Sequence, residues 1–312
     1  MSPTASNACS HFMKSRSSVE IRRCRPLLGT FVEIAARGKN IVALERAIDA
    51  AFAIVAEVHR LMSFHDPESD VSRMNRDAFP KGVTVHSWTW QVLKSAQQFT
   101  RESDGVFDIA IAPLLTEWNY LPRCGYRFDT TATSRDIFLK KNHRVFFRRR
   151  VIVDLGGIAK GFAVDRAVDA LRRNGVSSGI VNAGGDLRVF GDRPRQIHIR
   201  HPLNVETAAA TVILRDRAMA TSANYFSQQR CGETLLTPLT NGRTREACVE
   251  DVSVTVAAND CLTADALTKI VFCLRDKAQS ILARYRADAV LLERDLAARL
   301  LFTSHASLFH QA

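Results

Sequence analysis

The sequence predicts an α+β fold, in which antiparallel hairpins pack against amphipathic helices. Two observations support this class. Glycine turns join short alternating segments into hairpins, and the helical segments fall between groups of strands rather than after every strand, as a parallel sheet would require. The chain has 312 residues, of which 46% are hydrophobic and 24% charged, as in ordinary globular proteins. We therefore expect a sizeable core in one large domain or in two closely joined ones.

Polar composition sets the expected limits of the domain. Residues 1–25 are polar and basic and predict a disordered N-terminal segment, residues 26–295 the folded domain, and residues 296–312 a C-terminal tail. No apolar run approaches the roughly 20 residues needed to cross a membrane. Seven cysteines without CxxC pairs indicate reduced thiols and thus a cytoplasmic protein as the sequence is written. A misassigned start would hide a leader and make the protein periplasmic.

Helical periodicity and strand-like alternation assign the elements in chain order. Residues 63–75 are polar and predict a loop, and Pro113 predicts that a helix begins within residues 107–115. The other expected helices cover residues 41–62, 87–102, 158–173, 262–274 and 276–286. The expected strands cover residues 26–35, 151–153, 196–201, 209–215, 252–258 and 287–293, with short strands between 120 and 150 and a glycine-turn hairpin within 178–191.

The turn from Val153 to Gly161 carries the clearest chemical signal, because it combines a carboxylate, two glycines and a lysine at a helix start. Free amides at such a start, with Lys160 beside them, favour a polyanion. Asp154 would repel that anion directly. Its presence suggests either a bridging divalent cation or hydrogen bonds to ligand hydroxyls and ring nitrogens. The alternative is a tight strand-to-helix turn with a solvated lysine, which is more common for an isolated glycine-rich turn.

The net charge of +11 makes anionic partners plausible, including nucleotides, nucleic acid or a membrane surface. Much of the excess lies in two arginine clusters, one within residues 22–25 and one within residues 144–150. Arginines interleaved with aromatics can bind single-stranded nucleic acid. A hairpin edge with a solvated face explains residues 144–150 better. We therefore expect no nucleic-acid partner.

Seven segments, in this order, resemble successive motifs of the ApbE family of FAD:protein FMN transferases. They are residues 28–30, 63–75, 103–108, 154–161, 182–186, 220–225 and 264–267. The resemblance covers most of residues 26–293 and implies an ApbE-like α+β fold. It also implies Mg-dependent cleavage of FAD, in which the FMN phosphoryl group passes to a Thr or Ser of an acceptor flavoprotein and AMP leaves. The sequence names neither that acceptor nor an oligomeric state.

The resemblance implies a set of FAD-binding positions. Asp154 and Lys160 match residues on FAD, and Ser103-Asp104-Gly105 matches a flavin-contact turn, although a simple helix end is an equally natural explanation. His65 occupies a loop position where the family often carries an aromatic residue against FAD. A solvated histidine is the alternative there.

Two further positions belong to this set. Leu28 stands where a Met commonly precedes the Gly-Thr pair, a conservative change for packing. Thr234 stands where the family carries a His at the flavin nucleotide. The Gly184-Gly185 pair with Asp186 indicates a tight hairpin rather than a ligand site.

The metal ligands implied by the resemblance are the carbonyl of Gly157, the carboxylate of Asp265 and a threonine hydroxyl. The family carries that threonine four residues after the aspartate, where this chain has Lys269. Thr268, the candidate hydroxyl here, is rotated by about 100° around the helix. A protonated lysine cannot ligate a metal. It can replace part of the metal's charge against phosphate, or pair with Asp265.

A second departure concerns residues 234–242, where the family carries a His and an Asp at the positions of Thr234 and Thr237. That His is a candidate to assist the acceptor hydroxyl, and losing a general base typically costs ~10²–10⁴-fold in rate. Phosphoryl transfer itself needs a cradle and a cation more than a covalent residue, and we assign no catalytic residue. The alternative function is a flavin-binding or flavin-delivery accessory protein with reduced or no transfer activity.

Overall fold

The computed structural model describes residues 18–123, 125–200, 208–224, 227–293, 298–302 and 309–311. It confirms the predicted α+β class, because helices pack on a sheet whose neighbouring strands are all antiparallel. In spatial order, the strands of this eight-stranded sheet are β1 (Val19–Leu27), β2 (Thr30–Gly38), β6 (Ser178–Ala183), β7 (Asp186–Phe190), β10 (Ala218–Ala223), β15 (Val252–Ala258), β16 (Asp288–Glu293) and β17 (Ala298–Phe302).

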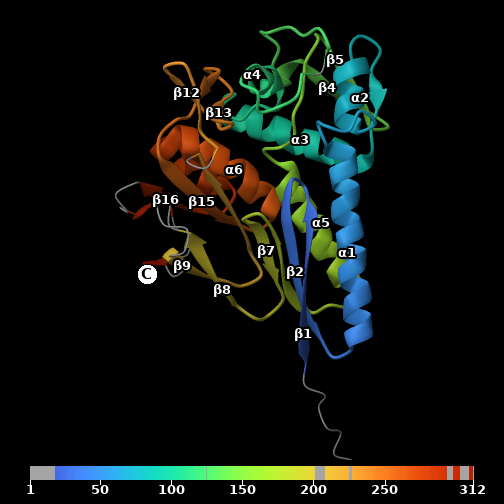
Figure 1. Cartoon of the computed structure of the whole chain (residues 1–312), viewed down its shortest axis with the longest axis vertical. Helices are drawn as coiled ribbons and strands as arrows, with labels where there is room; N and C mark the ends of the chain where they lie inside the picture. Colours follow the sequence, from blue (N-terminus) through green and yellow to red (C-terminus); the bar gives the residue numbers. More distant parts are fainter. Residues whose placement is uncertain are drawn as a thin grey trace, which may run out of the picture.

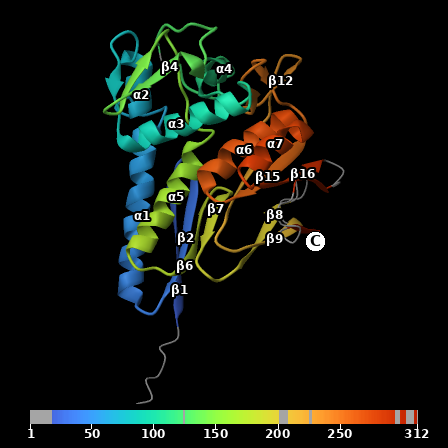
Figure 2. The ribbon, with the colours of Figure 1, turned by 180° about the vertical axis from the view of Figure 1, so that it is seen from behind.

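Three helices cover one face of this sheet: α1 (Ile41–Met62), α5 (Ala159–Arg173) and α6 (Cys261–Leu274). They lie behind the strands in Figure 1 and in front of them in Figure 2. The predicted helix 41–62 is confirmed with the same bounds. It begins at Asn40, whose side chain accepts a hydrogen bond from the Ala43 amide at 3.1 Å, and it buries an apolar stripe against the sheet.

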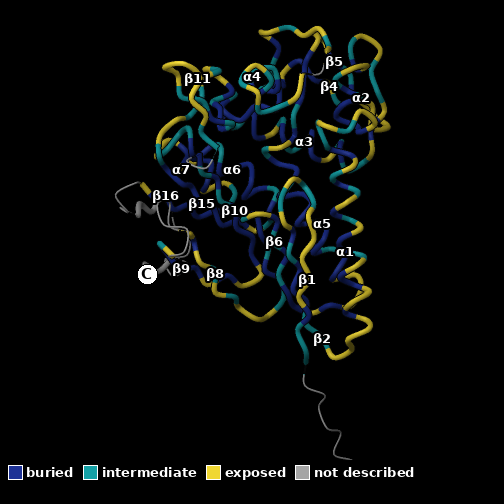
Figure 3. The backbone as a smooth tube through the Cα atoms, viewed as in Figure 1, coloured by how far each residue is buried: buried dark blue, intermediate teal, exposed yellow. Residues whose placement is uncertain are grey.

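A small three-stranded sheet packs on the opposite face. It consists of β8 (Arg195–Arg200), β9 (Ala208–Leu214) and β18 (Phe309–Gln311), in the order β18-β9-β8. A second apolar core fills the space between the two sheets, with Val212 from β9 and Val189 from β7 fully buried. The central strand β15 is buried at every residue because it lies between the two cores. Much of α6 is buried as well (Figure 3).

A third group of elements packs at one end of the sheet, above α5 and α6 in Figure 1. It contains α2 (Asp70–Asp77), α3 (Ser87–Glu102), η1 (Ile109–Ile111), α4 (Ala112–Glu117), η2 (Ser134–Asp136) and the sheet β3 (Val83–Thr84), β5 (Arg144–Phe147), β4 (Ile137–Lys140). Beside it lie the hairpins β11 (Gln229–Cys231) with β12 (Thr234–Leu236), and β13 (Thr240–Asn241) with β14 (Glu246–Ala247). After α6 come η3 (Arg275–Ala278) and α7 (Gln279–Arg284). No helix in the described ranges is long and apolar enough to cross a bilayer.

The start of the domain differs from the prediction. Residues 19–25 were assigned to a disordered segment and residues 26–35 to a single strand, but β1 already begins at Val19 and a turn at Leu28 and Gly29 joins it to β2. The arginines of β1 are compensated by acidic partners on β2 and α1, which a reading of local charge misses. These pairs are Arg22 with Glu33, Arg23 with Glu45 and Arg25 with Asp49. Residues 1–17 lie outside the described residues, and two parts of the expected tail, 298–302 and 309–311, form strands.

Three other local predictions were wrong. The expected loop 63–75 contains the start of α2, which Ser69 caps by accepting a hydrogen bond from the Ser72 amide at 3.0 Å. Residues 151–153 are buried but form no strand, because the Asn75 side chain satisfies both the amide and the carbonyl of Val153 at 2.8 and 3.0 Å. β5, expected as a hairpin edge, is the middle strand of its sheet.

Candidate functional site

A cavity of 430 Å³ lies where the third group of elements meets the start of α5, β10 and α6. Its volume falls within the range of about 300–1,000 Å³ that is usual for small-molecule sites. Apolar walls come from both sides, with Phe107 and Leu115 on one and Leu239 on the other. Its polar lining includes Asp154, Gly156, Gly157, Lys160, Ser222 and Lys269. Three of the sequence-predicted residues, Asp154, Gly157 and Lys160, therefore line one cavity.

The turn before α5 presents Asp154 to this cavity. Its backbone is fixed by the Asp154 amide, which donates to the Ile109 carbonyl at 2.9 Å, and its carboxylate accepts from the Gly156 amide at 3.1 Å. Burial raises the pKa of Asp154, and the Gly156 amide and the His65 imidazole oppose that rise. Burial therefore disfavours the ionised form of this carboxyl.

Lys160 projects into the cavity from the first turn of α5 and contacts the carboxylate of Asp186. The lysine side chain is 33% exposed, whereas that of Asp186 is 2% exposed, so the carboxylate lies behind the ammonium. Burial alone would lower the pKa of Lys160, but the carboxylates of Asp186 and Asp265 outweigh it and raise that pKa. Lys160 is therefore a permanent positive charge at the cavity.

Asp186 is the partner of a cavity residue, which sequence reasoning did not anticipate. Gly184 and Gly185 do form the tight β6–β7 turn that was expected, with φ of 65° and 107°. Asp186 follows this turn and is also the partner of Lys160. Burial raises its pKa, as does the nearby carboxylate of Asp265. Its place within one of the seven family-like segments was the available signal.

Asp265 is fully buried on α6, and both of its carboxylate oxygens are engaged. Oδ2 accepts from the Gly161 amide at 3.0 Å, and Oδ1 contacts the ammonium of Lys269. The same ammonium donates to the Asp265 carbonyl at 3.0 Å. Of the two roles that the sequence allowed for Lys269, the structure shows the pairing with Asp265.

The hydroxyl of Thr268 is engaged as well. It donates to the Asp265 carbonyl at 2.7 Å and lies 2.7 Å from the hydroxyl of Ser222 on β10. Among the described residues, no group of three or more His, Cys, Asp or Glu side chains is placed to hold a metal ion. The side-chain oxygens of Asp265 and Thr268 already have hydrogen-bond partners within the chain.

Ser103, Asp104 and Gly105 form the C-terminal end of α3 and stand next to the cavity rather than in its described lining. The buried Ser103 hydroxyl donates to the Phe99 carbonyl at 2.7 Å and accepts from the Phe107 amide at 3.0 Å. This bond positions Phe107, which lines the cavity. Asp104 points outward and binds two arginines, Arg135 and Arg243, each at 3.2 Å.

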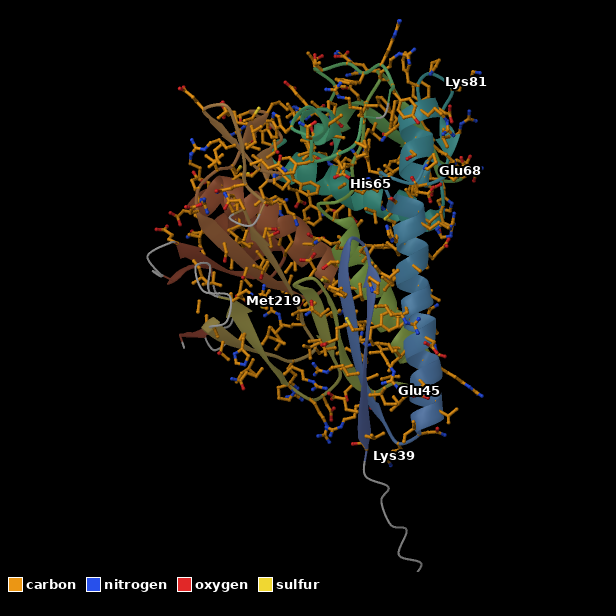
Figure 4. The ribbon with its side chains drawn as sticks, in the orientation of Figure 1. Lys39, Glu45, His65, Glu68, Lys81 and Met219 are labelled. Atoms are coloured by element: carbon orange, nitrogen blue, oxygen red, sulfur yellow. The ribbon has the colours of Figure 1, made fainter. Side chains whose placement is uncertain are left out.

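The remaining predicted flavin residues lie farther from the described lining of the cavity. Leu28 occupies the β1–β2 turn with φ of 57° and is partly buried against the core. His65 is exposed in the loop before α2 (Figure 4) and is near enough to Asp154 to oppose the rise of its pKa. Thr234 is exposed on β12. None of the three belongs to the described cavity lining, and their flavin roles stay predictions.

Thr237 shapes one wall of the cavity. Its buried hydroxyl donates to the carbonyls of Leu239 at 2.9 Å and Cys248 at 3.2 Å, and accepts from the Leu239 amide at 3.2 Å. These bonds fix the turn that places Pro238, Leu239 and Thr240 in the lining. The family carries an Asp here by resemblance, and threonine satisfies the same turn in this chain.

Comparison with known proteins gives one family. The model of the ApbE family matches residues 28–291. The chain is 29% identical over 235 residues to the FAD:protein FMN transferase of Vibrio cholerae serotype O1, covering 69% of each chain. It is 25% identical over 273 residues to the protein of that name from Haemophilus influenzae, covering 80% of this chain and 79% of the relative.

Solved structures agree on the fold. The apbe protein of Thermotoga maritima superposes with a TM-score of 0.81 at 26% identity, covering 90% of this chain and 97% of the other. The flavin transferase ApbE of Vibrio cholerae gives 0.75 at 22% identity, covering 95% and 97%, which is a likeness of fold alone. The expected ApbE-like fold is confirmed.

Proposed function

The chain belongs to the ApbE family, and from this premise we propose that it is an FAD:protein FMN transferase. FAD is the substrate, and the FMN phosphoryl group passes from it to the hydroxyl of a Thr or Ser of an acceptor flavoprotein. The bond between the two phosphates of FAD breaks, AMP leaves, and the hydroxyl proton passes to a base or to water. The relatives named above support the reaction class, and the cavity supports the choice of substrate.

One observation carries this proposal: a permanently charged lysine and the start of a helix meet at the same cavity. Lys160 and the turn from Asp154 to Gly157 form its polar corner, where a diphosphate gains the Lys160 ammonium at the positive end of the α5 helix dipole. The amides of Gly156, Ile158, Ala159 and Gly161 already donate within the chain. Another part of the lining is apolar and includes Phe107, Ile109 and Leu239. A flat aromatic ring suits that part, as in most cofactor sites.

Asp154 has a specific role in this proposal. Its carboxyl lines the cavity, where it can form hydrogen bonds with hydroxyls or ring nitrogens of the ligand. The carboxyl is held by the Gly156 amide, which sets its direction toward the cavity. We assign it to substrate binding and leave the base unassigned.

The resemblance implies that the reaction depends on Mg²⁺, but the contacts of Asp265 and Thr268 do not favour binding of this ion. The Asp265 carboxylate already contacts the Lys269 ammonium and the Gly161 amide, and the Thr268 hydroxyl already contacts Ser222 and the Asp265 carbonyl.

A second candidate function is a flavin-binding or flavin-delivery protein without transfer activity. The specific observation that favours it concerns the two threonines at the positions of the family's His and Asp. Thr234 is exposed on β12, and the hydroxyl of Thr237 is hydrogen-bonded within the turn of residues 237–239. Neither therefore offers a general base at the cavity.

The state of the thiols supports a proposal for where the protein acts. The cysteines in the described part of the chain, Cys24, Cys231, Cys248, Cys261 and Cys273, are all free. Free thiols suit a reducing compartment, and we propose that the protein acts in the cytoplasm.

Transfer is tested by incubating the purified chain with FAD and an acceptor flavoprotein domain that carries the target Thr. Flavin fluorescence of the acceptor band on a denaturing gel is expected, and the acceptor with Thr→Ala serves as the control. A dark acceptor band, together with retained FAD binding, would support the accessory role. Absence of FAD binding as well would refute both functions.

A further inference from the structure

We propose that Lys269 supplies from within the chain the positive charge that the family resemblance assigns to a divalent cation, so that FAD binds to this protein without Mg²⁺. The inference rests on the proposed function, because it takes FAD as the ligand. It concerns how the same cavity holds the diphosphate.

Lys269 lines the cavity, whereas its partner Asp265 is not among the described lining residues. The lysine side chain is 18% exposed and that of Asp265 is 0% exposed. The carboxylate is therefore screened from a ligand by the ammonium that it holds, and the ligand meets the positive end of the pair.

The cavity has a second lysine that is paired with a buried carboxylate. Lys160 also lines the cavity and is also held from behind by a buried carboxylate, that of Asp186. The two pairs are neighbours, since the charges of Asp265, Lys160 and Lys269 all affect the pKa of Asp186. Two ammonium groups on one wall match the two negative charges of a diphosphate.

The ammonium of Lys269 has three N–H groups. Lys269 directs two of them to the carboxylate and the carbonyl of Asp265. The third remains for a phosphate oxygen in the cavity. The two bonds to Asp265 hold the head group in place before the ligand arrives.

The contacts of Asp265 with Lys269 and Gly161 disfavour a divalent cation. A metal at Asp265 would have to displace the Lys269 ammonium from Oδ1 or the Gly161 amide from Oδ2. It would then stand beside an ammonium on the same helix, and like charges at such distances repel strongly in a poorly hydrated site. The Thr268 hydroxyl would also have to leave the Asp265 carbonyl.

The inference is tested by titrating the full-length protein with FAD and following the change in flavin fluorescence, once in EDTA and once in Mg²⁺. The wild-type protein should bind FAD equally well in both. Lys269→Thr should lose about 10- to 100-fold in affinity in EDTA, the effect of one charge-assisted hydrogen bond, and regain part of it in Mg²⁺. Lys269→Arg, which keeps the charge, should retain Mg-independent binding.

A second measurement does not depend on FAD. Binding of Mn²⁺, followed by electron paramagnetic resonance, should be weak in the wild-type protein and stronger in Lys269→Thr, which frees Asp265. Lys81→Thr is the matched control, since Lys81 is exposed and lies at the end of the molecule beyond α2 (Figure 4). Thermal melting of each variant checks that it is folded.

The outcomes separate the inference from the proposed function. Wild-type FAD binding that requires Mg²⁺, or Lys269→Thr binding FAD in EDTA as well as the wild type does, would overturn the inference and leave the transferase proposal in place. Mg-independent binding without any labelled acceptor would overturn transfer and uphold the inference. A protein that binds no FAD under either condition refutes both.

Discussion

Gly161 on α5 and Cys261 on α6 bring the two helices into backbone contact: a Cβ atom at Gly161 would stand 2.2 Å from the Cys261 carbonyl oxygen and 2.8 Å from the Cβ of Asp265. No side chain fits into this gap. The close approach lets the Gly161 amide reach Asp265, and the buried Asp165 strengthens it by accepting from the Cys261 and Leu262 amides at 3.0 and 2.9 Å. The spacing of α5 and α6 thus positions Lys160 against Lys269.

Gly161→Ala is expected to destabilise the protein by about 1–3 kcal/mol, because the added methyl group forces the helices apart. FAD affinity should fall with it, since the two lysines separate. Urea unfolding and FAD titration measure the two effects. Gly157→Ala is the matched control for stability, as its methyl group would meet only ordinary contacts at 3.7 and 3.8 Å. Equal stability of the two variants would contradict this packing argument.

Asp154→Asn should stabilise the protein at neutral pH. The raised pKa of Asp154 in the folded state means that ionising its carboxyl costs folding free energy. This cost is absent below the carboxyl's ordinary pKa, grows as pH rises toward the folded-state value, and is constant above it. The variant's advantage in thermal melting should follow that course, while its FAD affinity falls. A variant that is less stable than the wild type at pH 7 would disprove this assignment.

Asp129→Asn should show the opposite sign. The Thr131 hydroxyl and amide lower the pKa of Asp129, so its ionised form stabilises the folded state. That contribution is present above the carboxyl's ordinary pKa and is lost as pH falls through the lowered one. Melting curves across the same pH series should therefore show a variant weaker than the wild type at neutral pH and equal to it in acid. A matching trend in both Asp→Asn variants would point to a general pH effect.

Lys160→Met should weaken FAD binding by about 10- to 100-fold, the scale of a lost charge-assisted hydrogen bond. It should also cost about 1–3 kcal/mol of stability, because it leaves the buried Asp186 carboxylate without its partner. Adding Asp186→Asn should restore stability without restoring FAD affinity. Unfolding curves and FAD titrations of both variants separate the two effects. Full recovery of affinity in the double variant would remove Lys160 from the ligand site.

Thr237→Val should destabilise the protein by about 1–3 kcal/mol, since it removes a buried hydroxyl that serves two carbonyls and one amide. The wall at Pro238 to Thr240 should loosen, and FAD affinity should drop. Thr234→Val, on the exposed strand β12, is the control and should leave stability unchanged. Its FAD affinity measures directly whether Thr234 contributes to binding. The prediction fails if the two variants unfold at the same urea concentration.

Elements with strong local signals were predictable. The helices at 41–62 and 87–102 have the expected bounds because an apolar stripe and N-terminal capping side chains mark them in the sequence. Strand β1 was not predictable, because its arginines form ion pairs with Glu33, Glu45 and Asp49 only in the folded chain. α2 was missed because its residues are mostly polar and the cap at Ser69 resembled a loop.

The site divides in the same way. Asp154, Gly157 and Lys160 lie within seven residues of each other, so one segment predicted a corner of the cavity. Asp186 and the apolar walls come from distant segments, and nothing local distinguishes Phe107 or Leu239 from an ordinary core residue. The Lys269 and Asp265 pair was available from helical spacing alone, although its direction toward the cavity was not.

The contact of α5 with α6 at Gly161 also affects how selectively the cavity binds a ligand. Helices joined backbone to backbone cannot slide, so the charged wall has its final shape before any ligand is present. A ligand then pays no ordering entropy to assemble that wall, and mismatched anions cannot improve their fit by moving it. Discrimination at this wall is a matter of rigid geometry.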